Sequence, residues 1–101
     1  MQYEIMQTDA TIEVQLQGRM EFTDHKVFRD LISQLSEPSG KNLVFNLAGL
    51  DFIDSSGLGM LIIANNVARQ NRVEFRLMRP RDGVRRVLEV AKFQTIAPID
   101  P

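Results

Sequence analysis

The sequence predicts an α/β fold, in which a mixed sheet of four to five strands, with an antiparallel N-terminal hairpin and parallel central strands, packs with about three helices. Two observations lead to this prediction. Alternating apolar residues near the start indicate a hairpin, and further strand-like runs then alternate with helical stripes along the 101 residues. Strands that alternate with helices are typical of parallel sheets joined by right-handed crossovers. The length favours one domain covering residues 1–101.

The first 35 residues predict the hairpin and one helix. Apolar side chains occupy alternate positions on both sides of a polar turn at residues 8–10, so one face of the hairpin should be buried. These side chains are Tyr3, Ile5, Ile12, Val14 and Leu16. Gly18 is expected to end the second strand, and Thr23 or Asp24 suits the N-cap of a helix that continues to about Leu35. The helix carries one apolar stripe, formed by Phe28, Leu31, Ile32 and Leu35.

The middle of the chain predicts a buried strand and a second helix. Pro38 and Gly40 break the chain within "SEPSGKN". The run "LVFNL" at residues 43–47 is almost continuously apolar, as in a strand that is covered on both faces. A polar and glycine-containing stretch follows, and an apolar-rich helix is then expected to continue to about Gln70.

The last third of the chain predicts a strand, a helix and a short final strand. Alternation in "VEFRLM" indicates a strand over residues 73–78. Pro80 and the pair Asp82 and Gly83 are expected to open the last helix. Its apolar positions have helical spacing and are Val84, Val87, Leu88 and Ala91. The segment "FQTIAPI" at residues 93–99 is expected to add a short strand.

Composition argues against several classes of function. The chain has no cysteine, which rules out disulfides and thiolate metal sites, and His25 is its one histidine, which argues against a histidine-based metal site. We expect no cofactor. No apolar run approaches the ~20 residues of a membrane span, and the start "MQYEIMQTDA" lacks the basic region of a signal peptide. We therefore expect a cytoplasmic protein without membrane insertion.

The charged residues are unevenly distributed. A net charge of −1 argues against general binding to nucleic acid. Residues 1–68 hold four basic and nine acidic side chains, whereas residues 69–101 hold eight basic and four acidic ones. We expect the arginines of the basic part to pair with the acidic part on a solvated surface. A patch that binds phosphate or acidic groups is the alternative.

The segment "DFIDSSGLGM" at residues 51–60 is the most unusual stretch of the chain. Ser55 follows a predicted strand and precedes a predicted helix, so it is the expected N-cap. A cap does not explain Gly57 and Gly59, each of which weakens a helix by roughly 1 kcal/mol relative to alanine. Glycines beside a serine at a helix start suggest that another group comes close to the backbone there.

A helical wheel places Ser55 beside exposed apolar side chains. The wheel advances 100° per residue, and its solvent side is marked by Asn65, Asn66, Arg69 and Gln70. The same side carries Ser55, Leu58, Gly59 and Ile62. The core side carries Met60, Leu61, Ala64, Val67 and Ala68. A small apolar patch beside a hydroxyl group and a glycine is a reasonable surface for a partner protein.

Readings of this region as an enzyme have little support. A nucleophile elbow needs glycines on both sides of Ser55, and a Ser–His–Asp triad would have to recruit His25. "SGKN" lacks both the earlier glycine and the Ser or Thr of a P-loop. Asp51 and Asp54 could act as an acid–base pair or hold a divalent ion, but two carboxylates alone are weak evidence for either. We expect no enzymatic activity and keep a small serine- or metal-dependent enzyme as an alternative.

The motif resembles that of a known family. "NLAGLDFIDSSGLGMLI" is similar to the central motif of STAS domains, specifically of bacterial anti-sigma factor antagonists. "VQLQGRMEF" resembles the second strand and glycine-containing turn of that family, and "FRLMRPRDGVRRVLEVAKF" its last strand and helix. The family has a mixed sheet with helices. Glu21 stands where the family often has Asp, and Asn46 and Ala48 depart from its common D-L-S spelling.

The resemblance implies a phosphorylation switch that regulates transcription by partner switching. In such proteins the serine after the aspartate, here Ser55, is phosphorylated by a serine kinase that is also the anti-sigma factor or a relative of it. A PP2C-type phosphatase reverses this. The unphosphorylated form binds the kinase, which then releases its other client, typically a sigma factor. The partner-binding residues implied or inferred here are Glu21, Asp51, Asp54, Ser56, Gly57, Leu58, Gly59 and Ile62.

Two alternatives remain within this resemblance. STAS domains also serve as accessory subunits of transport or other signalling complexes, in which the serine need not be phosphorylated. If a phosphate is added at a position other than Ser55, Ser56 or Thr23 is the expected acceptor.

Overall fold

The computed structural model describes residues 1–35 and 42–101, which form five strands, three α-helices and two 3₁₀ turns. The strands are β1 (Gln2–Gln7), β2 (Thr11–Met20), β3 (Asn42–Ile53), β4 (Glu74–Met78) and β5 (Ile99–Asp100). The helices are α1 (His25–Gln34), α2 (Ser55–Gln70) and α3 (Asp82–Val90), and the 3₁₀ turns are η1 (Phe22–Asp24) and η2 (Phe93–Thr95).

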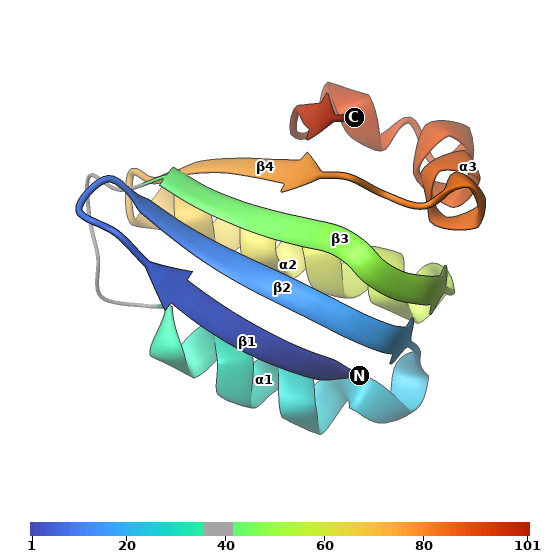
Figure 1. The fold of residues 1–101 in the computed structure, drawn as a ribbon, viewed down its shortest axis with the longest axis horizontal. Helices are drawn as coiled ribbons and strands as arrows, with labels where there is room; N and C mark the ends of the chain where they lie inside the picture. Colours follow the sequence, from blue (N-terminus) through green and yellow to red (C-terminus); the bar gives the residue numbers. More distant parts are fainter. Residues whose placement is uncertain (36–41) are drawn as a thin grey trace.

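The strands form one mixed sheet in the order β1-β2-β3-β4-β5. β1 pairs with β2 antiparallel, and all other neighbours pair parallel. α1 and α2 lie on one face of this sheet, whereas α3 lies beyond the end of β4 (Figure 1). The predicted fold class, with its N-terminal hairpin, parallel central strands and three helices, is therefore confirmed. Among residues 1–35 and 42–101, none of the helices has both the length and the apolar character that a membrane span requires.

The core lies between the sheet and the two helices that cover it. Alternation in β2 puts Ile12, Val14 and Leu16 into the core, as predicted. Phe45 of β3 packs edge-on against Phe75 of β4, with 5.1 Å between the ring centroids. The predicted stripe of α1 is also confirmed, since Phe28, Leu31 and Leu35 are buried.

The other face of the sheet carries polar side chains, and this corrects one expectation about β3. Glu13 pairs in register with Val44, and Gln15 with Asn46. Gln15 Nε2 donates to Glu13 Oε2 at 3.0 Å, and Asn46 Nδ2 donates to the same oxygen at 3.4 Å. The helices α1 and α2 cover only one face of β3 (Figure 1), so a strand covered on both faces was the wrong interpretation of its apolar run.

Several element boundaries also differ from the predictions. β2 does not end at Gly18, which instead adopts φ +85° at a bulge, and the strand continues to Met20. β3 continues well past the predicted run at residues 43–47, pairing with β4 up to Asn46 and with β2 alone after that. Residues 93–99 begin with η2, and the final strand is β5. The break expected at Pro38 and Gly40 lies outside the described residues.

Candidate functional site

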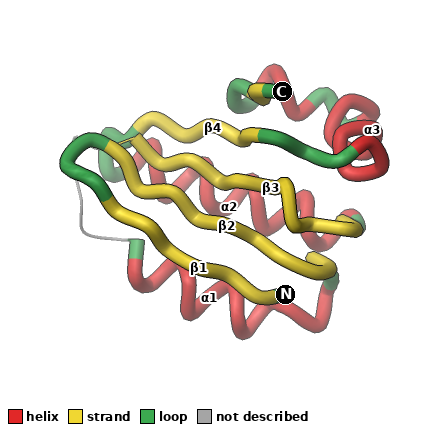
Figure 2. Tube along the Cα trace, viewed as in Figure 1, coloured by secondary structure: helices red, strands yellow, loops and turns green. Residues whose placement is uncertain are grey.

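The candidate site lies where the parallel strands β2 and β3 end together (Figure 2). Their last residues, Met20 and Ile53, are paired in register. The backbone N–H of Asp54 also donates to the carbonyl oxygen of Met20 at 3.3 Å. Glu21 and Asp54 therefore leave the sheet side by side, and α2 begins immediately afterwards. Ligands and partners of open α/β sheets commonly bind at this edge, where the carboxyl ends of the parallel strands meet.

Asp54, and not Ser55, is the N-cap of α2. The backbone of Asp54 is extended (φ −105°, ψ −173°), and its Oδ1 accepts a hydrogen bond from the N–H of Gly57 at 2.8 Å. Aspartate and serine are equally good caps, so the sequence alone did not distinguish the two neighbours. Ser55 is the first residue of α2 and its side chain is exposed. The carboxylate thus performs the capping that the sequence assigned to the hydroxyl group.

The two glycines of the motif have different roles. A Cβ atom on Gly57 would lie 2.6 Å from both Ile53 Cγ1 and the carbonyl oxygen of Met20. Gly57 therefore lets α2 pack directly on the ends of β2 and β3, and the close group is part of this chain. A Cβ atom on Gly59 would have no atom within 4 Å. Only Gly59 leaves space that a partner could use, so the reading of both glycines as clearance is corrected for Gly57.

The helical wheel of α2 is confirmed on its core side and partly wrong on its solvent side. Met60, Leu61, Ala64 and Ala68 are buried, and Ile62 is exposed, as predicted. Asn65, which was assigned to the solvent side, is only 6% exposed. Leu58 is half-buried and packs against the core. The solvent side was defined by polar residues, which placed Asn65 on it and left out Ile63, although Ile63 is 45% exposed.

Two of the acidic residues expected to bind a partner, Glu21 and Asp51, form ion pairs with arginines. Arg19 donates from Nε to Glu21 Oε1 at 2.8 Å, and its guanidinium lies 4.2 Å from the ring centroid of Phe52. Asp51 pairs with Arg81, whose Nε also donates to the carbonyl oxygen of Ala48 at 2.8 Å. Both pairs are exposed, so each contributes only about 0–1 kcal/mol to stability. Their main effect at this site is to offset the charges of two carboxylates.

The pair of Arg81 with Asp51 joins the basic and acidic parts of the chain, as expected. Arg76 pairs instead with Asp100, at 2.8 Å from Nε to Oδ2, within the basic part. The expected pairing therefore holds for one of these two arginines.

Asp24 has a structural role that the sequence did not reveal. Its side chain is largely buried beside η1, where Oδ1 accepts a hydrogen bond from the Met1 ammonium group and Oδ2 from the Glu21 N–H, both at 2.8 Å. Burial of Asp24 raises the pKa of its carboxyl group, but these two hydrogen bonds and the ammonium charge outweigh burial and lower the pKa below 3.8. Asp24 thereby holds Glu21 and the start of α1 in place. A buried acid can be recognised only from the packing around it.

The geometry gives little support to the alternative of a serine- or metal-dependent enzyme. The ring of His25 packs edge-on against Phe22, with centroids 5.1 Å apart. In the part of the chain that the structure describes, no three His, Asp or Glu side chains are grouped so that they could hold a metal ion.

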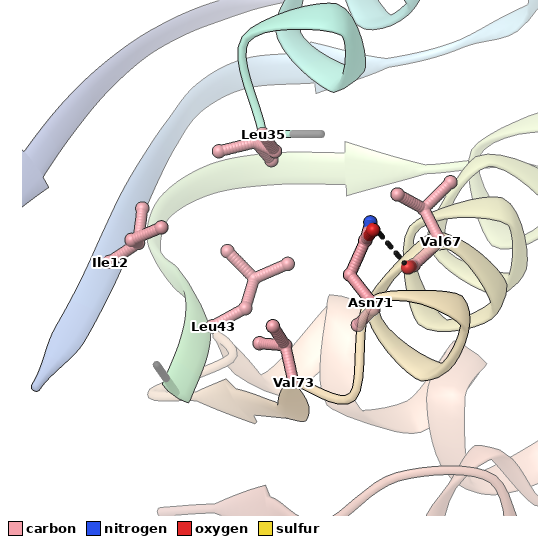
Figure 3. A pocket seen from close by; sticks show the side chains of 7 residues that line it. Ile12, Leu35, Leu43, Val67, Asn71 and Val73 are labelled. Carbon is pink, nitrogen blue, oxygen red and sulfur yellow. Dashed lines mark hydrogen bonds between the residues drawn. The ribbon is translucent and has the colours of Figure 1, made fainter. Parts of the chain in front are cut away.

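A small, partly open pocket lies at the other end of the parallel strands, and Figure 3 shows its lining. Asn71 closes one side of this pocket by donating from Nδ2 to the carbonyl oxygen of Val67 at 3.0 Å. Its volume of about 10 Å³ is close to the lower limit for a single water molecule. This pocket is therefore too small for a cofactor or substrate.

Comparison with known proteins places this chain in one family. The STAS domain family model matches residues 2–101. A STAS-domain containing protein of Pseudomonas aeruginosa (strain UCBPP-PA14) is 28% identical over 85 residues, which cover 84% of this chain and 83% of that protein.

Solved structures share the fold. An anti-sigma factor antagonist from Mycobacterium paratuberculosis superposes with a TM-score of 0.86 at 18% identity, covering 99% of this chain and 85% of that chain. The anti-sigma factor antagonist SpoIIAA in its unphosphorylated form gives a TM-score of 0.77 at 20% identity, covering 99% and 88%. At such identities, the likeness shows the fold alone.

Proposed function

The chain belongs to the STAS domain family, and from this premise we propose that it is an anti-sigma factor antagonist whose partner binding is switched by phosphorylation of Ser55. The position of Ser55 is the observation that carries the proposal. Its exposed hydroxyl group stands at the first residue of α2, outside the cap, at the edge where β2 and β3 end. A kinase can reach such a hydroxyl group without unfolding the domain.

The start of α2 tolerates a phosphate on Ser55. The first intrahelical hydrogen bond runs from the Leu58 N–H to the carbonyl oxygen of Asp54 at 3.0 Å, and the Gly57 N–H is held by the Asp54 side chain. The N–H groups of Ser55 and Ser56 precede these and point out of the helix start. Free amides and the helix dipole favour an anion there. The phosphate is therefore expected to leave the fold intact.

The effect of the phosphate falls on the surface that meets the partner. Glu21 and Asp51 have arginine partners, whereas no basic residue within 1–35 and 42–101 forms an ion pair with Asp54. Phosphorylation adds about −1.5 to −2 charges to this nearly balanced edge. Like charges opposed across an interface can cost several kcal/mol, which corresponds to a hundredfold or greater loss of affinity.

In this proposal the chain acts by binding and performs no catalysis itself. A serine kinase that is also an anti-sigma factor binds the unphosphorylated form, contacting Glu21, Asp51 and the first two turns of α2. In those turns the contacts come from Asp54, Ser56, Leu58, Gly59 and Ile62, whereas Gly57, which is buried against β2 and β3, only supports the helix start. A PP2C-type phosphatase resets the switch in the cytoplasm, and residues 1–101 act as a single domain.

An intact-mass measurement tests the phosphoacceptor. The chain is incubated with ATP and candidate serine kinases, and the mass is expected to rise by one phosphate. Ser55→Ala should abolish this rise, whereas the matched variant Ser56→Ala, which alters a half-buried neighbour, should retain it. A phosphate that persists in Ser55→Ala and disappears in Ser56→Ala or Thr23→Ala would contradict the assignment.

A further inference from the structure

A groove between α1 and α2 has no role in the function proposed so far. It has a volume of about 130 Å³. Its lining residues are His25, Phe28, Arg29, Ile32 and Ile63. The lining is mostly apolar, and the one residue in it that always carries a charge is Arg29. Dry cavities of roughly 150 Å³ lined by aliphatic and aromatic side chains accept a group the size of benzene. The groove is thus large enough for one aromatic or branched aliphatic side chain.

Two exposed apolar side chains extend the groove toward the end of the sheet. Ile63 forms its α2 wall and is 45% exposed. Phe22 is 69% exposed and packs edge-on against His25, which lines the groove at the start of α1. Single exposed apolar residues are common, but here they adjoin a concave apolar surface. Such a combination marks an interaction surface.

The groove is continuous with the surface around Ser55. Ser55, Gly59 and Ile63 follow one another at intervals of four residues, so they lie along one side of α2. Gly59 separates the hydroxyl group from the groove, and it has open space above it. On the other side, Phe22 directly follows Glu21, which adjoins Asp54. A protein bound over Ser55 would therefore cover the groove as well.

We propose that this groove receives an aromatic or branched aliphatic side chain of the kinase that binds at Ser55, with an acidic residue of the kinase meeting Arg29. This proposal rests on the function proposed above. Within residues 1–35 and 42–101, no carboxylate forms an ion pair with Arg29, although Arg29 is exposed and lines an otherwise mostly apolar groove. An apolar anchor flanked by an acid complements both features.

The groove supplies affinity, whereas Ser55 supplies control. Buried apolar anchors that fill a pocket on the partner typically carry most of the binding energy of an interface. The phosphate at Ser55 acts two turns away, by charge. Changes in the groove should therefore weaken binding in both the presence and the absence of phosphate, and they should not alter which residue is phosphorylated.

Calorimetric titration tests the groove directly. The probe is the purified serine kinase that phosphorylates the chain, used without ATP so that Ser55 remains unmodified. Ile63→Lys and Arg29→Glu are each expected to raise Kd at least tenfold, by removing the apolar wall and by reversing the charge at the rim. Val90→Lys is the matched control, because Val90 is 78% exposed on α3, away from the groove. It should bind as the unaltered chain does.

The outcomes separate this inference from the proposed function. Thermal unfolding first checks that each variant is folded. If Ile63→Lys does not fold, Arg29→Glu alone tests the groove, because it alters an exposed side chain. If both groove variants bind normally while Ser55→Asp binds weakly, the groove proposal is wrong and the switch stands. If Ser55→Asp also binds normally, the switch itself fails. If the groove variants change only self-association, as seen by sedimentation, the occupant is a second copy and the proposal is overturned.

Discussion

Asp54 and Ser55 divide two tasks that the sequence places on adjacent residues. The carboxylate of Asp54 caps α2 through the Gly57 N–H, and the hydroxyl group of Ser55 stays exposed. A hydroxyl group that served as the cap would be held against the amides of the first turn and would be less accessible to a kinase. Because the cap is a separate residue, a phosphate on Ser55 can change the surface while the helix start keeps its structure.

Gly57 and Gly59 give opposite predictions for alanine. Gly57→Ala should destabilise the chain by about 1–3 kcal/mol, since its Cβ would overlap the Met20 carbonyl oxygen and Ile53. Gly59→Ala should stabilise it by up to about 1 kcal/mol, since its Cβ meets nothing and alanine favours a helix. Urea unfolding measures both changes. Equal effects of the two substitutions would show that α2 does not rest on the sheet as described.

The sequence predicted the strand-to-helix turn within residues 51–60 but not the structural role of each residue in it. The D-S-S-G-L-G stretch indicated Ser55, yet the cap, the packing of Gly57 and the burial of Asn65 required coordinates. Adjacent residues with equal capping preference cannot be told apart without backbone dihedral angles. Likewise, a polar residue cannot be placed at a helix–sheet boundary without the neighbouring strand.

The length of β3 determines where the candidate site lies. Its first half pairs with β2 and β4, whereas the part after Asn46 pairs with β2 alone. After Asn46, β4 no longer covers this edge of β3. Arg81, which precedes α3, partly covers it by bonding to the Ala48 carbonyl oxygen and to Asp51. This long strand carries Asp54 and the start of α2 beyond the end of β4.

The ends of α2 and α3 make a prediction about stability. Each helix is followed, after its C-cap, by a basic residue with positive φ: Arg72 at 57° and Lys92 at 55°. Residues other than glycine cost roughly 1–2 kcal/mol in this conformation, and glycine is preferred at the position. Lys92→Gly should therefore raise the free energy of unfolding by about 1 kcal/mol. A denaturation midpoint that falls would contradict this account.

Hydrophobic periodicity predicted the elements well, but their ends less well. The stripes of α1 and α3 and the alternation of β2 located those elements, because burial repeats with the period of each structure. The ends of β2 and β3 depend on pairing between distant segments and on a bulge at Gly18, and a local pattern contains neither.

In the molecule as a whole, residues distant in sequence meet at one edge of the sheet. Glu21 with Phe22 follows β2, Ser55 follows β3, and Arg81 reaches this edge from the start of α3. The groove between α1 and α2 opens on the same side of α2 as Ser55 and Gly59. A partner would thus meet an apolar surface beside a nearly balanced set of charges. In the proposed switch, one phosphate on Ser55 would change that balance while the fold stays the same.

The central claim is tested most directly by comparing the affinity of Ser55→Asp and Ser55→Ala for the purified serine kinase, measured by calorimetry without ATP. Ser55→Ala is expected to bind like the unaltered chain. Ser55→Asp, which carries part of the charge of a phosphate, is expected to bind at least tenfold more weakly. Both variants should unfold at similar urea concentrations. Equal affinities of the two folded variants would contradict a phosphorylation switch at Ser55.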